Sequence, residues 1–184
     1  MYIIAGKYYR RKIASPKGAE TRPTSSRLRE TVFNIIQEGV EGSDFLDVFA
    51  GTGAMGIEAL SRGAKRATFI EGNPGAIQTL KDNLKSLEIT HQGNVMFGDY
   101  IKNLKILGNN QGKFDIIFAD APYHLKDAAS ILLNQIIANQ LLKAGGKVFI
   151  ENDEPLLQQN FSGLVHLNSR KSGKSYLHLF QKDS

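Results

Sequence analysis

The sequence predicts an α/β fold, in which helices cover a mostly parallel β-sheet that ends in an antiparallel edge hairpin. Three observations predict it. From residue 45 onward, apolar runs alternate with stretches of helical periodicity. Residues 114–119 are almost entirely apolar, as in a central strand that is buried on both faces. Two strand-like runs near the end, residues 164–168 and 176–180, are separated by a segment too short for a crossover helix.

The chain begins with a segment that predicts a short basic β-hairpin. Residues 2–5 form an apolar run, Gly6 and Lys7 provide a turn, and residues 8–14 mix aromatic with basic side chains. Residues 15–18 then interrupt regular structure. We therefore expect a small β-hairpin extension before the sheet.

The first helix is predicted from apolar residues at helical spacing within residues 28–36. Thr24 or Ser25 is the expected N-cap, and Arg27 and Arg29 lie off the apolar stripe. The later elements alternate along the chain. The expected strands are residues 45–50, 67–71, 94–97, 114–119 and 147–151. The expected helices are residues 54–62, 74–87, 100–107 and 126–142.

The positive charge is concentrated at the start of the chain. The net charge is +5 and the isoelectric point is about 9.4. Residues 1–30 hold eight of the 23 basic residues and two acidic ones, a net charge of +6, so that residues 31–184 carry −1. Segregation of this kind points to a polyanionic partner, most often nucleic acid. The alternative is a solvated, solubilising tail.

The composition excludes several classes of protein. The 184 residues include no cysteine, which excludes disulfides, thiolate zinc sites and cysteine nucleophiles. The four histidines lack metal-ligand spacing, so we expect no metal. No apolar stretch approaches the ~20 residues that span a bilayer, and the first residues lack the order of a signal peptide. We therefore expect a cytoplasmic protein without a membrane partner.

A glycine-rich loop follows the first expected strand. Residues 51–56 read GTGAMG, in which small residues let the backbone approach a ligand closely before a helix begins. Glu71 ends the next strand 20 residues after Gly51, where a carboxylate can accept hydrogen bonds from both hydroxyls of a ribose. The alternative is a tight turn whose glycines let the helix pack on the sheet.

Nicotinamide dinucleotides and S-adenosylmethionine both use such a loop, and three features favour S-adenosylmethionine. Asp47, inside the first strand, suits a cationic sulfonium ligand better than a pyrophosphate. Asp99, just after the third strand, is placed to reach an adenine amino group. The antiparallel hairpin at the end is the third feature. The alternatives are a turn-stabilising carboxylate for Asp47 and a helix N-cap for Asp99.

Residues 120–123 read Asp-Ala-Pro-Tyr and follow the buried strand, at the sheet edge where open α/β sheets bind ligands. This tetrapeptide suits methyl transfer to an exocyclic base amine, whose lone pair is delocalised into the ring. Asp120 and the carbonyl of Ala121 can accept hydrogen bonds from the amine and aim its lone pair. Pro122 fixes the chain direction, and Tyr123 offers a ring for a flipped base. The alternative is a plain turn.

Six motifs along nearly the full length carry a resemblance to a known family. They are IIAGK at residues 3–7, TRPT at 21–24, RE at 29–30, FNI at 33–35, LDVFAGTGA at 46–54 and GIEALSRGA at 56–64. With them the chain resembles the small-subunit ribosomal RNA guanine-N2 methyltransferases, the family called rRNA small subunit methyltransferase D. The glycine-loop motif is shared by many methyltransferases, whereas the basic N-terminal motif joined to it is far more specific.

The resemblance implies a Rossmann-like class I methyltransferase fold, S-adenosylmethionine as methyl donor and a guanine of 16S ribosomal RNA, free or in a small-subunit particle, as acceptor. We expect a monomer with a basic RNA-binding extension over residues 1–23 and a methyltransferase domain over residues 24–184. The implied catalytic residues are Asp120, Ala121, Pro122 and Tyr123. The implied donor-binding residues are Asp47, Phe49, Ala50, Gly51, Thr52, Gly53, Glu71 and Asp99. The implied RNA-binding residues are Lys7, Arg10, Arg11, Arg22 and Arg27.

The chain departs from the family pattern at two positions. The family usually reads Asp-Pro-Pro-Tyr where this chain has Ala121, which keeps the carbonyl but makes the loop less rigid. Near the end the family often has an aromatic residue before the glycine, where this chain has Ser172. Three other functions stay open: methylation of adenine N6 or of another RNA or DNA amine, a non-catalytic RNA-binding assembly factor, and a nicotinamide-dependent oxidoreductase.

Overall fold

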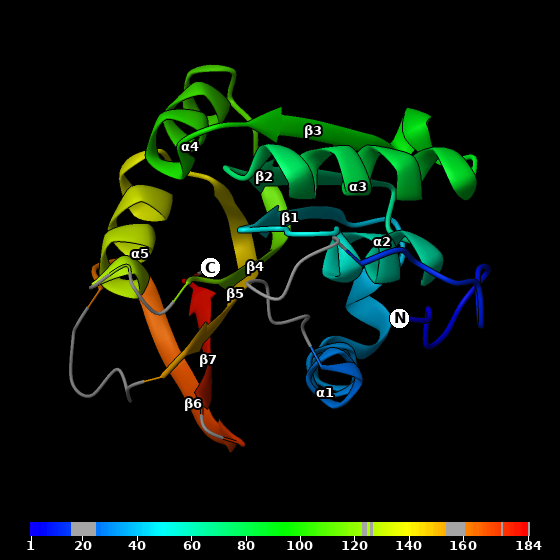
Figure 1. The fold of residues 1–184 in the computed structure, drawn as a ribbon. Helices are drawn as coiled ribbons and strands as arrows, with labels where there is room; N and C mark the ends of the chain where they lie inside the picture. Colours follow the sequence, from blue (N-terminus) through cyan, green and yellow to red (C-terminus); the bar gives the residue numbers. More distant parts are fainter. Residues whose placement is uncertain (16–24, 123–124, 126, 154–160, 174, 184) are drawn as a thin grey trace.

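The computed structural model is built on one seven-stranded sheet with the strand order β3-β2-β1-β4-β5-β7-β6 (Figure 1). It describes residues 1–15, 25–122, 125, 127–153, 161–173 and 175–183. The strands are β1 (Asp44–Val48), β2 (Arg66–Glu71), β3 (Gly93–Phe97), β4 (Phe114–Asp120), β5 (Leu142–Asn152), β6 (Leu164–Ser172) and β7 (Ser175–Lys182). The helices are α1 (Ser26–Ile36), α2 (Ala54–Ser61), α3 (Pro74–Ser86), α4 (Tyr100–Asn109) and α5 (Ala128–Ala138), with 3₁₀ turns η1 (Gln37–Val40) and η2 (Thr90–Gln92).

The sheet is parallel from β3 to β5 and antiparallel at the β7–β6 edge, which confirms the predicted arrangement. Each parallel neighbour is reached through a helix, whereas β6 and β7 follow each other too closely for a crossover. The carboxyl ends of the five parallel strands therefore share one edge. Because Tyr176 pairs with Asn152, the tip of the β6–β7 hairpin lies at this edge too.

Successive strand residues face opposite sides of the sheet, so the sheet separates two apolar cores. Phe45, Phe69 and Phe118 pack in the core that includes α1, α2 and α3. Leu46 and Ile117 pack in the core that includes α4 and α5. Figure 1 shows these two groups of helices on opposite faces. The central strands are buried on both faces, which explains the apolar run that predicted β4.

The predicted N-terminal β-hairpin is present in a short form, in which only the two ends of the segment pair. Residues 1–15, here called the amino-terminal arm, fold back on themselves, but Tyr2 and Lys12 form a single antiparallel bridge. The residues between them turn because they are bonded to α2: the N–H of Lys7 donates to the Ser61 carbonyl at 2.7 Å. Gly6 has a φ of +81°, and a Cβ there would lie 1.8 Å from the same carbonyl oxygen. The two ends of the arm are paired: the N–H of Ile3 donates to the Arg11 carbonyl at 3.0 Å, and the N–H of Ile13 donates to the Met1 carbonyl at 2.9 Å. Tertiary contacts with α2 hold the turn between these ends.

The boundary between α5 and β5 also differs from the prediction. The helix expected to reach residue 142 ends at Ala138, and Leu142 already belongs to β5. The reason is that the carbonyl of Leu141 accepts a hydrogen bond from the N–H of Phe114 at 2.8 Å, which draws these buried leucines into the sheet. At the other end of the chain, α1 begins as expected, with Ser25 as its N-cap: Ser25 Oγ accepts from the N–H of Leu28 at 3.1 Å.

The outermost strand, β6, carries a bulge. Its register with β7 shifts between His166 and Asn168, so that Leu167 is an extra residue without a partner position. Val165 and Leu167 are 47% and 48% exposed. Among the described helices, none has both the length and the apolar character needed to cross a membrane.

Candidate functional site

The glycine loop joins β1 to α2, and its three glycines have different neighbours. Gly53 has a φ of +79°, and a Cβ there would lie 2.2 Å from Leu80 Cδ1 of α3. A Cβ at Gly56 would lie 2.2 Å from Phe69 Cε1 of β2. Gly51 also has a positive φ, +56°, but apart from its two neighbours in the chain no atom of the described residues lies within 4 Å of its Cβ position. The last two glycines therefore let the helix pack closely, while the first borders open space in which a ligand can approach the backbone.

Glu71 and the glycine loop are brought together, as their spacing predicts. Glu71 Oε2 accepts a hydrogen bond from the N–H of Gly51 at 2.6 Å, and Oε1 accepts from the N–H of Asn73 at 2.7 Å. The carboxylate is half-buried at the carboxyl end of β2 and keeps further acceptor capacity on both oxygens. This placement fits the ribose hydroxyls of a nucleoside ligand.

Asp47 supports the loop from beneath. It is 2% exposed, and its Oδ2 accepts from the N–H of Gly56 at 2.9 Å. Burial raises the pKa of Asp47 well above its usual value, and the nearby negative charges of Glu71 and Asp120 act in the same direction, against the Gly56 hydrogen bond. Its visible contact is that of a carboxylate that stabilises the turn from loop to helix.

Asp99 caps α4. Its Oδ1 accepts from the N–H of Lys102 at 2.9 Å, and the side chain is exposed after the end of β3. The contact is the N-cap that the sequence offers as an alternative, and a donor-binding role for Asp99 stays a prediction.

Aromatic side chains stand around this edge, and two of them, Tyr100 and Phe97, are ones that the sequence analysis missed. Phe49, in the loop with a φ of +62°, lies 4.8 Å from the ring of Tyr100, centroid to centroid. Phe97 pairs with Glu71 in the sheet and is 60% exposed. An exposed aromatic at a strand end is the signal that could have found Phe97. Burial, followed by the charge of Asp99, raises the pKa of Tyr100.

The tetrapeptide begins at the end of β4, next to β1. Ala119 pairs with Val48 of β1, and Asp120 pairs with Glu151 of β5. Asp120 and Ala121 are half-buried, and Pro122 is exposed. Asp120 and the glycine loop therefore sit on adjacent strands at one edge. Tyr123, the fourth member of the predicted motif, lies outside the described residues.

The basic residues of the arm are exposed. Lys7 Nζ lies 5.4 Å from the ring centroid of Tyr8, and the Arg10 guanidinium lies 5.1 Å from that of Tyr9. Arg11 donates to the carbonyl of Ser86 at 3.1 Å. On α1, Arg27 is exposed as well, whereas Arg22 lies outside the described part of the chain.

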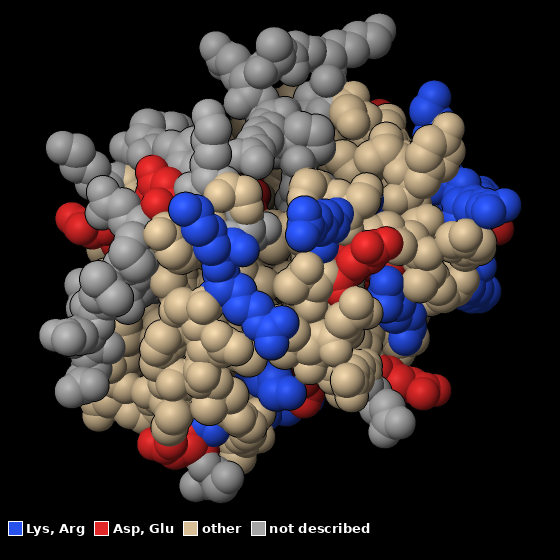
Figure 2. All heavy atoms as spheres, turned by 90° about the horizontal axis from the view of Figure 1, so that it is seen from below, with Lys and Arg blue, Asp and Glu red and all other residues tan. Residues whose placement is uncertain are grey.

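Figure 2 views the end of the molecule at which α1 and the β6–β7 tip lie in Figure 1. Basic side chains form a broken band across this face, and acidic side chains lie mostly toward its margins. The charge distribution suits a polyanion.

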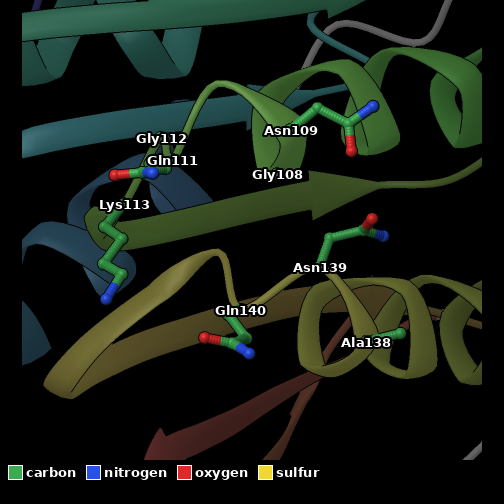
Figure 3. Close-up of a pocket in the computed structure, with 8 residues that line it drawn as sticks. All are labelled: Gly108, Asn109, Gln111, Gly112, Lys113, Ala138, Asn139 and Gln140. Carbon is green, nitrogen blue, oxygen red and sulfur yellow. The ribbon is translucent and has the colours of Figure 1, made fainter.

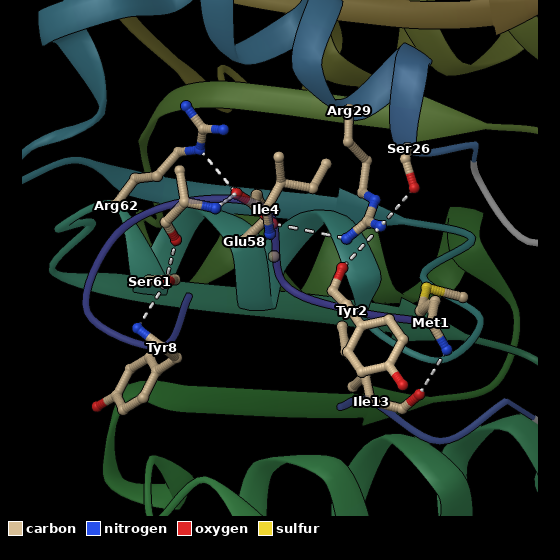
Figure 4. A network of polar contacts seen from close by, with 12 residues as sticks. Met1, Tyr2, Ile4, Tyr8, Ile13, Ser26, Arg29, Glu58, Ser61 and Arg62 are labelled. Carbon is tan, nitrogen blue, oxygen red and sulfur yellow. Dashed lines mark hydrogen bonds and ion pairs between the residues drawn. The ribbon is translucent and has the colours of Figure 1, made fainter. Parts of the chain in front are cut away.

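One of the basic residues near the start is structural. Arg29, which the helical pattern puts off the apolar stripe, is fully buried beside Glu58 of α2 at 3.5 Å (Figure 4). Glu58 also accepts from the N–H groups of Ile4 and Ala5 at 2.9 and 3.0 Å and from Arg62 Nε at 2.8 Å. Burial lowers the pKa of Arg29, and the Glu58 charge opposes this. The network fastens the arm to α1 and α2.

A recess of about 390 Å³ lies at the opposite edge of the sheet (Figure 3). It is bounded by the last residues of α4 and α5 and by the amino ends of β4 and β5. Its lining is Gly108, Asn109, Gln111, Gly112, Lys113, Ala138, Asn139 and Gln140. Within the described ranges, no three His, Asp or Glu side chains gather as a metal site would require.

Comparisons with known proteins agree with this geometry. The family model described as conserved hypothetical protein 95 matches residues 1–181. The Haemophilus influenzae protein named ribosomal RNA small subunit methyltransferase D is 36% identical over 158 residues, covering 84% of this chain and 81% of that protein. The solved structure of the Escherichia coli methyltransferase candidate yhhF has a TM-score of 0.87 and 29% identity, covering 100% of this chain and 98% of that one.

A more distant structure shares the fold alone. SMU.776, a methyltransferase candidate solved in complex with SAH, has a TM-score of 0.67 at 13% identity, and covers 84% of this chain and 48% of that one. The predicted class I methyltransferase fold is thereby confirmed.

Proposed function

Because the chain belongs to the conserved hypothetical protein 95 family, together with the rRNA small subunit methyltransferase D proteins, we propose that it methylates the exocyclic N2 amine of a guanine in 16S ribosomal RNA. The chain is an S-adenosylmethionine-dependent methyltransferase. The observation that carries the finer proposal is the position of Asp120, at the end of β4 beside the strand that leads into the glycine loop. A purine amine held by Asp120 there lies next to the donor's site.

The donor site is assigned to the loop between β1 and α2 and to the acids around it. The backbone of Phe49, Ala50, Gly51, Thr52 and Gly53 forms the loop, with Asp47 beneath it. Glu71 binds the ribose hydroxyls and Asp99 the adenine. When bound, S-adenosylmethionine supplies a methyl group made electrophilic by its sulfonium. The open space at Gly51 and the carboxylate of Glu71 fit such a nucleoside.

The tetrapeptide activates the acceptor by alignment. The Asp120 carboxylate and the carbonyl of Ala121 accept hydrogen bonds from the two N–H groups of the amine, which draws the nitrogen toward a tetrahedral shape. The carboxylate also holds the proton that the amine loses. Pro122 fixes the direction of the chain, and Tyr123 stacks on the flipped base. Guanine N2 and adenine N6 both satisfy this geometry, and the resemblance to the guanine-N2 methyltransferases supports the choice of guanine.

The RNA is held mainly by the arm. Lys7, Arg10 and Arg11, with Arg22 and Arg27, contact phosphates, and the half-buried ring of Tyr8 and the exposed ring of Tyr9 lie beside these cations. The basic face of Figure 2 extends the surface that a folded RNA or a small-subunit particle can cover. The protein acts as a monomer in the cytoplasm in this proposal.

Methyl transfer to small-subunit RNA tests the proposal. The 16S RNA and the intact small subunit are purified from cells that lack this activity and incubated with labelled S-adenosylmethionine and the protein. After digestion to nucleosides, mass detection should find N2-methylguanosine. If the product is N6-methyladenosine, the substrate is an adenine amine and the proposed guanine is wrong. Binding of the donor without any product on free RNA or on particles would instead identify an RNA-binding assembly factor.

A further inference from the structure

One buried side chain contacts both the amino-terminal arm and the glycine loop. Asn83 of α3 is 2% exposed. Its Oδ1 accepts a hydrogen bond from the N–H of Ala14 at 2.8 Å, and its Nδ2 donates to the carbonyl of Ala14 at 3.2 Å. The same Nδ2 donates to the carbonyl of Thr52, inside the loop, at 3.1 Å. Both N–H groups of the carboxamide and its oxygen are therefore engaged.

The same stretch of α3 contacts the arm and the loop at further points. Leu80, one turn before Asn83, packs under Gly53, where an added Cβ would lie 2.2 Å away. At the end of the helix, the Ser86 carbonyl accepts a hydrogen bond from Arg11 of the arm at 3.1 Å. Arm and loop are thus joined through residues 80–86, and Asn83 is the side chain that bonds to both.

A displaced arm would change the loop. Displacement of Ala14 removes two of the three hydrogen bonds that orient the Asn83 carboxamide and opens it to water, so that it is free to rotate away from Thr52. The loop needs such fixing, because Gly51 and Gly53 at φ of +56° and +79° give its backbone access to many other conformations. An arm held in place therefore favours the loop conformation of this structure, and a held loop favours the arm in return.

We propose that Asn83 is a positioning residue that couples RNA binding at the arm to donor binding at the glycine loop, so that each ligand tightens the other. The inference rests on the proposed function, because it takes the arm as the RNA-binding element. Thermodynamic linkage requires that RNA changes the affinity for the donor by the same factor by which the donor changes the affinity for RNA. Ordering of a shared element is sufficient to produce it, without a change of fold.

The coupling is measured with S-adenosylhomocysteine, which binds but transfers no methyl group. Its dissociation constant is determined with and without a saturating amount of the unmethylated 16S RNA. We expect the RNA to tighten binding about fivefold in the wild type and less than about twofold in Asn83→Ala. Asn139→Ala is the matched control, since among the described residues the Asn139 carboxamide bonds to Gln135 of α5 and to neither the arm nor the loop, and it should keep the wild-type factor. If Asn83 merely stabilised the fold, Asn83→Ala would lower the melting temperature and leave the coupling factor unchanged.

Amide hydrogen exchange tests the link without a variant. S-adenosylhomocysteine alone should slow exchange of the Ala14 amide severalfold, although Ala14 belongs to the arm. The Asn139 amide, which donates to the Gln135 carbonyl at 3.0 Å, serves as reference and should not respond.

An equal coupling factor in wild type and Asn83→Ala, or an Ala14 amide that ignores the ligand, would overturn the inference. The proposed function is judged separately, by methyl transfer from wild-type protein to the same RNA. Transfer without coupling refutes only the role of Asn83. Slowed Ala14 exchange without transfer supports the arm–loop link and refutes the substrate.

Discussion

At Gly51 the backbone conformation and the space around it make opposite demands on a side chain. Its φ of +56° disfavours any other residue, yet the Cβ position is open. In our assignment this space belongs to the donor. At Gly53 and Gly56 the neighbours Leu80 and Phe69 already exclude a Cβ. The first glycine is therefore the position at which a methyl group would affect binding more than packing.

We expect Gly51→Ala to weaken donor binding at least tenfold. The matched control is Gly42→Ala, since Gly42 has a φ of +70° and is likewise open, but lies before β1, at the other edge of the sheet. Both variants should lose about 1–2 kcal/mol of unfolding free energy from the backbone. Calorimetric titration with S-adenosylhomocysteine separates them. Equal affinities in the two variants would place the donor away from Gly51.

Asp120→Asn should lower kcat about 10²–10³-fold and leave the dissociation constant of the donor within about twofold. The amide keeps the size of the side chain but loses one acceptor and the charge that polarises the amine. Asp82→Asn, an exposed change on α3, controls for the loss of a carboxylate. Single-turnover kinetics measure the effect. A large loss of donor affinity in Asp120→Asn would show that this carboxylate belongs to the donor site.

Residue by residue, the sequence predicted positions better than contacts. Glu71 meets the loop because a motif spacing fixes where a strand ends. Asp47 lies in a strand and Asp99 follows a strand, as predicted, but the partners of these carboxylates in the structure are the N–H groups of Gly56 and Lys102. Such local partners depend on dihedral angles that no spacing encodes. Arg29 was unpredictable for another reason: its counter-charge, Glu58, comes from a different helix.

Among the elements, the arm shows what tertiary structure adds. β1, β2 and β4 were predictable because their apolar runs are buried on both faces, which leaves one arrangement. The two ends of the arm pair as the hairpin pattern predicts. Its contacts with Ser61 and Glu58 of α2 hold the residues between these ends, and no sequence pattern encodes those contacts. Figure 4 shows how closely the arm follows α2.

Glu58→Gln should lower the unfolding free energy by about 3–5 kcal/mol, because it leaves the Arg29 guanidinium buried without its counter-charge. Two N–H groups of the arm also share this carboxylate. The exposed Glu88→Gln is the control, expected within about 0.5 kcal/mol of wild type. Urea unfolding measures both. A loss below about 1 kcal/mol would mean that the arm leaves the body readily.

Point changes test the arm more cleanly than its removal. Ile3 and Ile13 are buried in the core, so truncation would expose it. In Lys7→Gln and Arg10→Gln, RNA affinity should fall, and the slope of log K against log salt should decrease by about 1 for each phosphate that the variant no longer binds. Lys65→Gln, exposed at the start of β2, is the control. If the slopes of log K against log salt are unchanged, Lys7 and Arg10 do not bind phosphates, and the charge of the arm serves solubility.

Across the whole molecule, an ion network fastens the amino edge of the sheet. Lys143 Nζ lies 2.7 Å from Asp115 Oδ2 and 3.0 Å from Asp44 Oδ2, and Arg66 also bonds Asp44. The hydrogen bond to Asp115 raises the pKa of Lys143, against the effect of burial. Burial alone would raise the pKa of Asp44, but the hydrogen bonds from Lys143 and Arg66 outweigh it, so that the pKa of Asp44 is lowered.

The network makes stability depend on pH at both extremes. The depressed pKa of Asp44 adds stability above about pH 4 that is lost as pH falls through its folded pKa. The raised pKa of Lys143 adds stability below about pH 10 that is lost as pH rises through its folded pKa. Lys143→Met should therefore lower the unfolding free energy at neutral pH, and the difference from wild type should shrink at both ends. Lys113→Met, exposed before β4, should show no such profile in urea unfolding.

The bulge in β6 has a consequence for how copies of this molecule avoid one another. An outermost strand with exposed Val165 and Leu167 offers backbone groups to any other extended chain. The extra residue, Leu167, breaks the even spacing of those groups and increases the local twist. Deletion of Leu167 would leave a regular edge strand that can pair with other chains. Concentrated solutions of this variant should form fibrils under conditions in which the natural sequence does not.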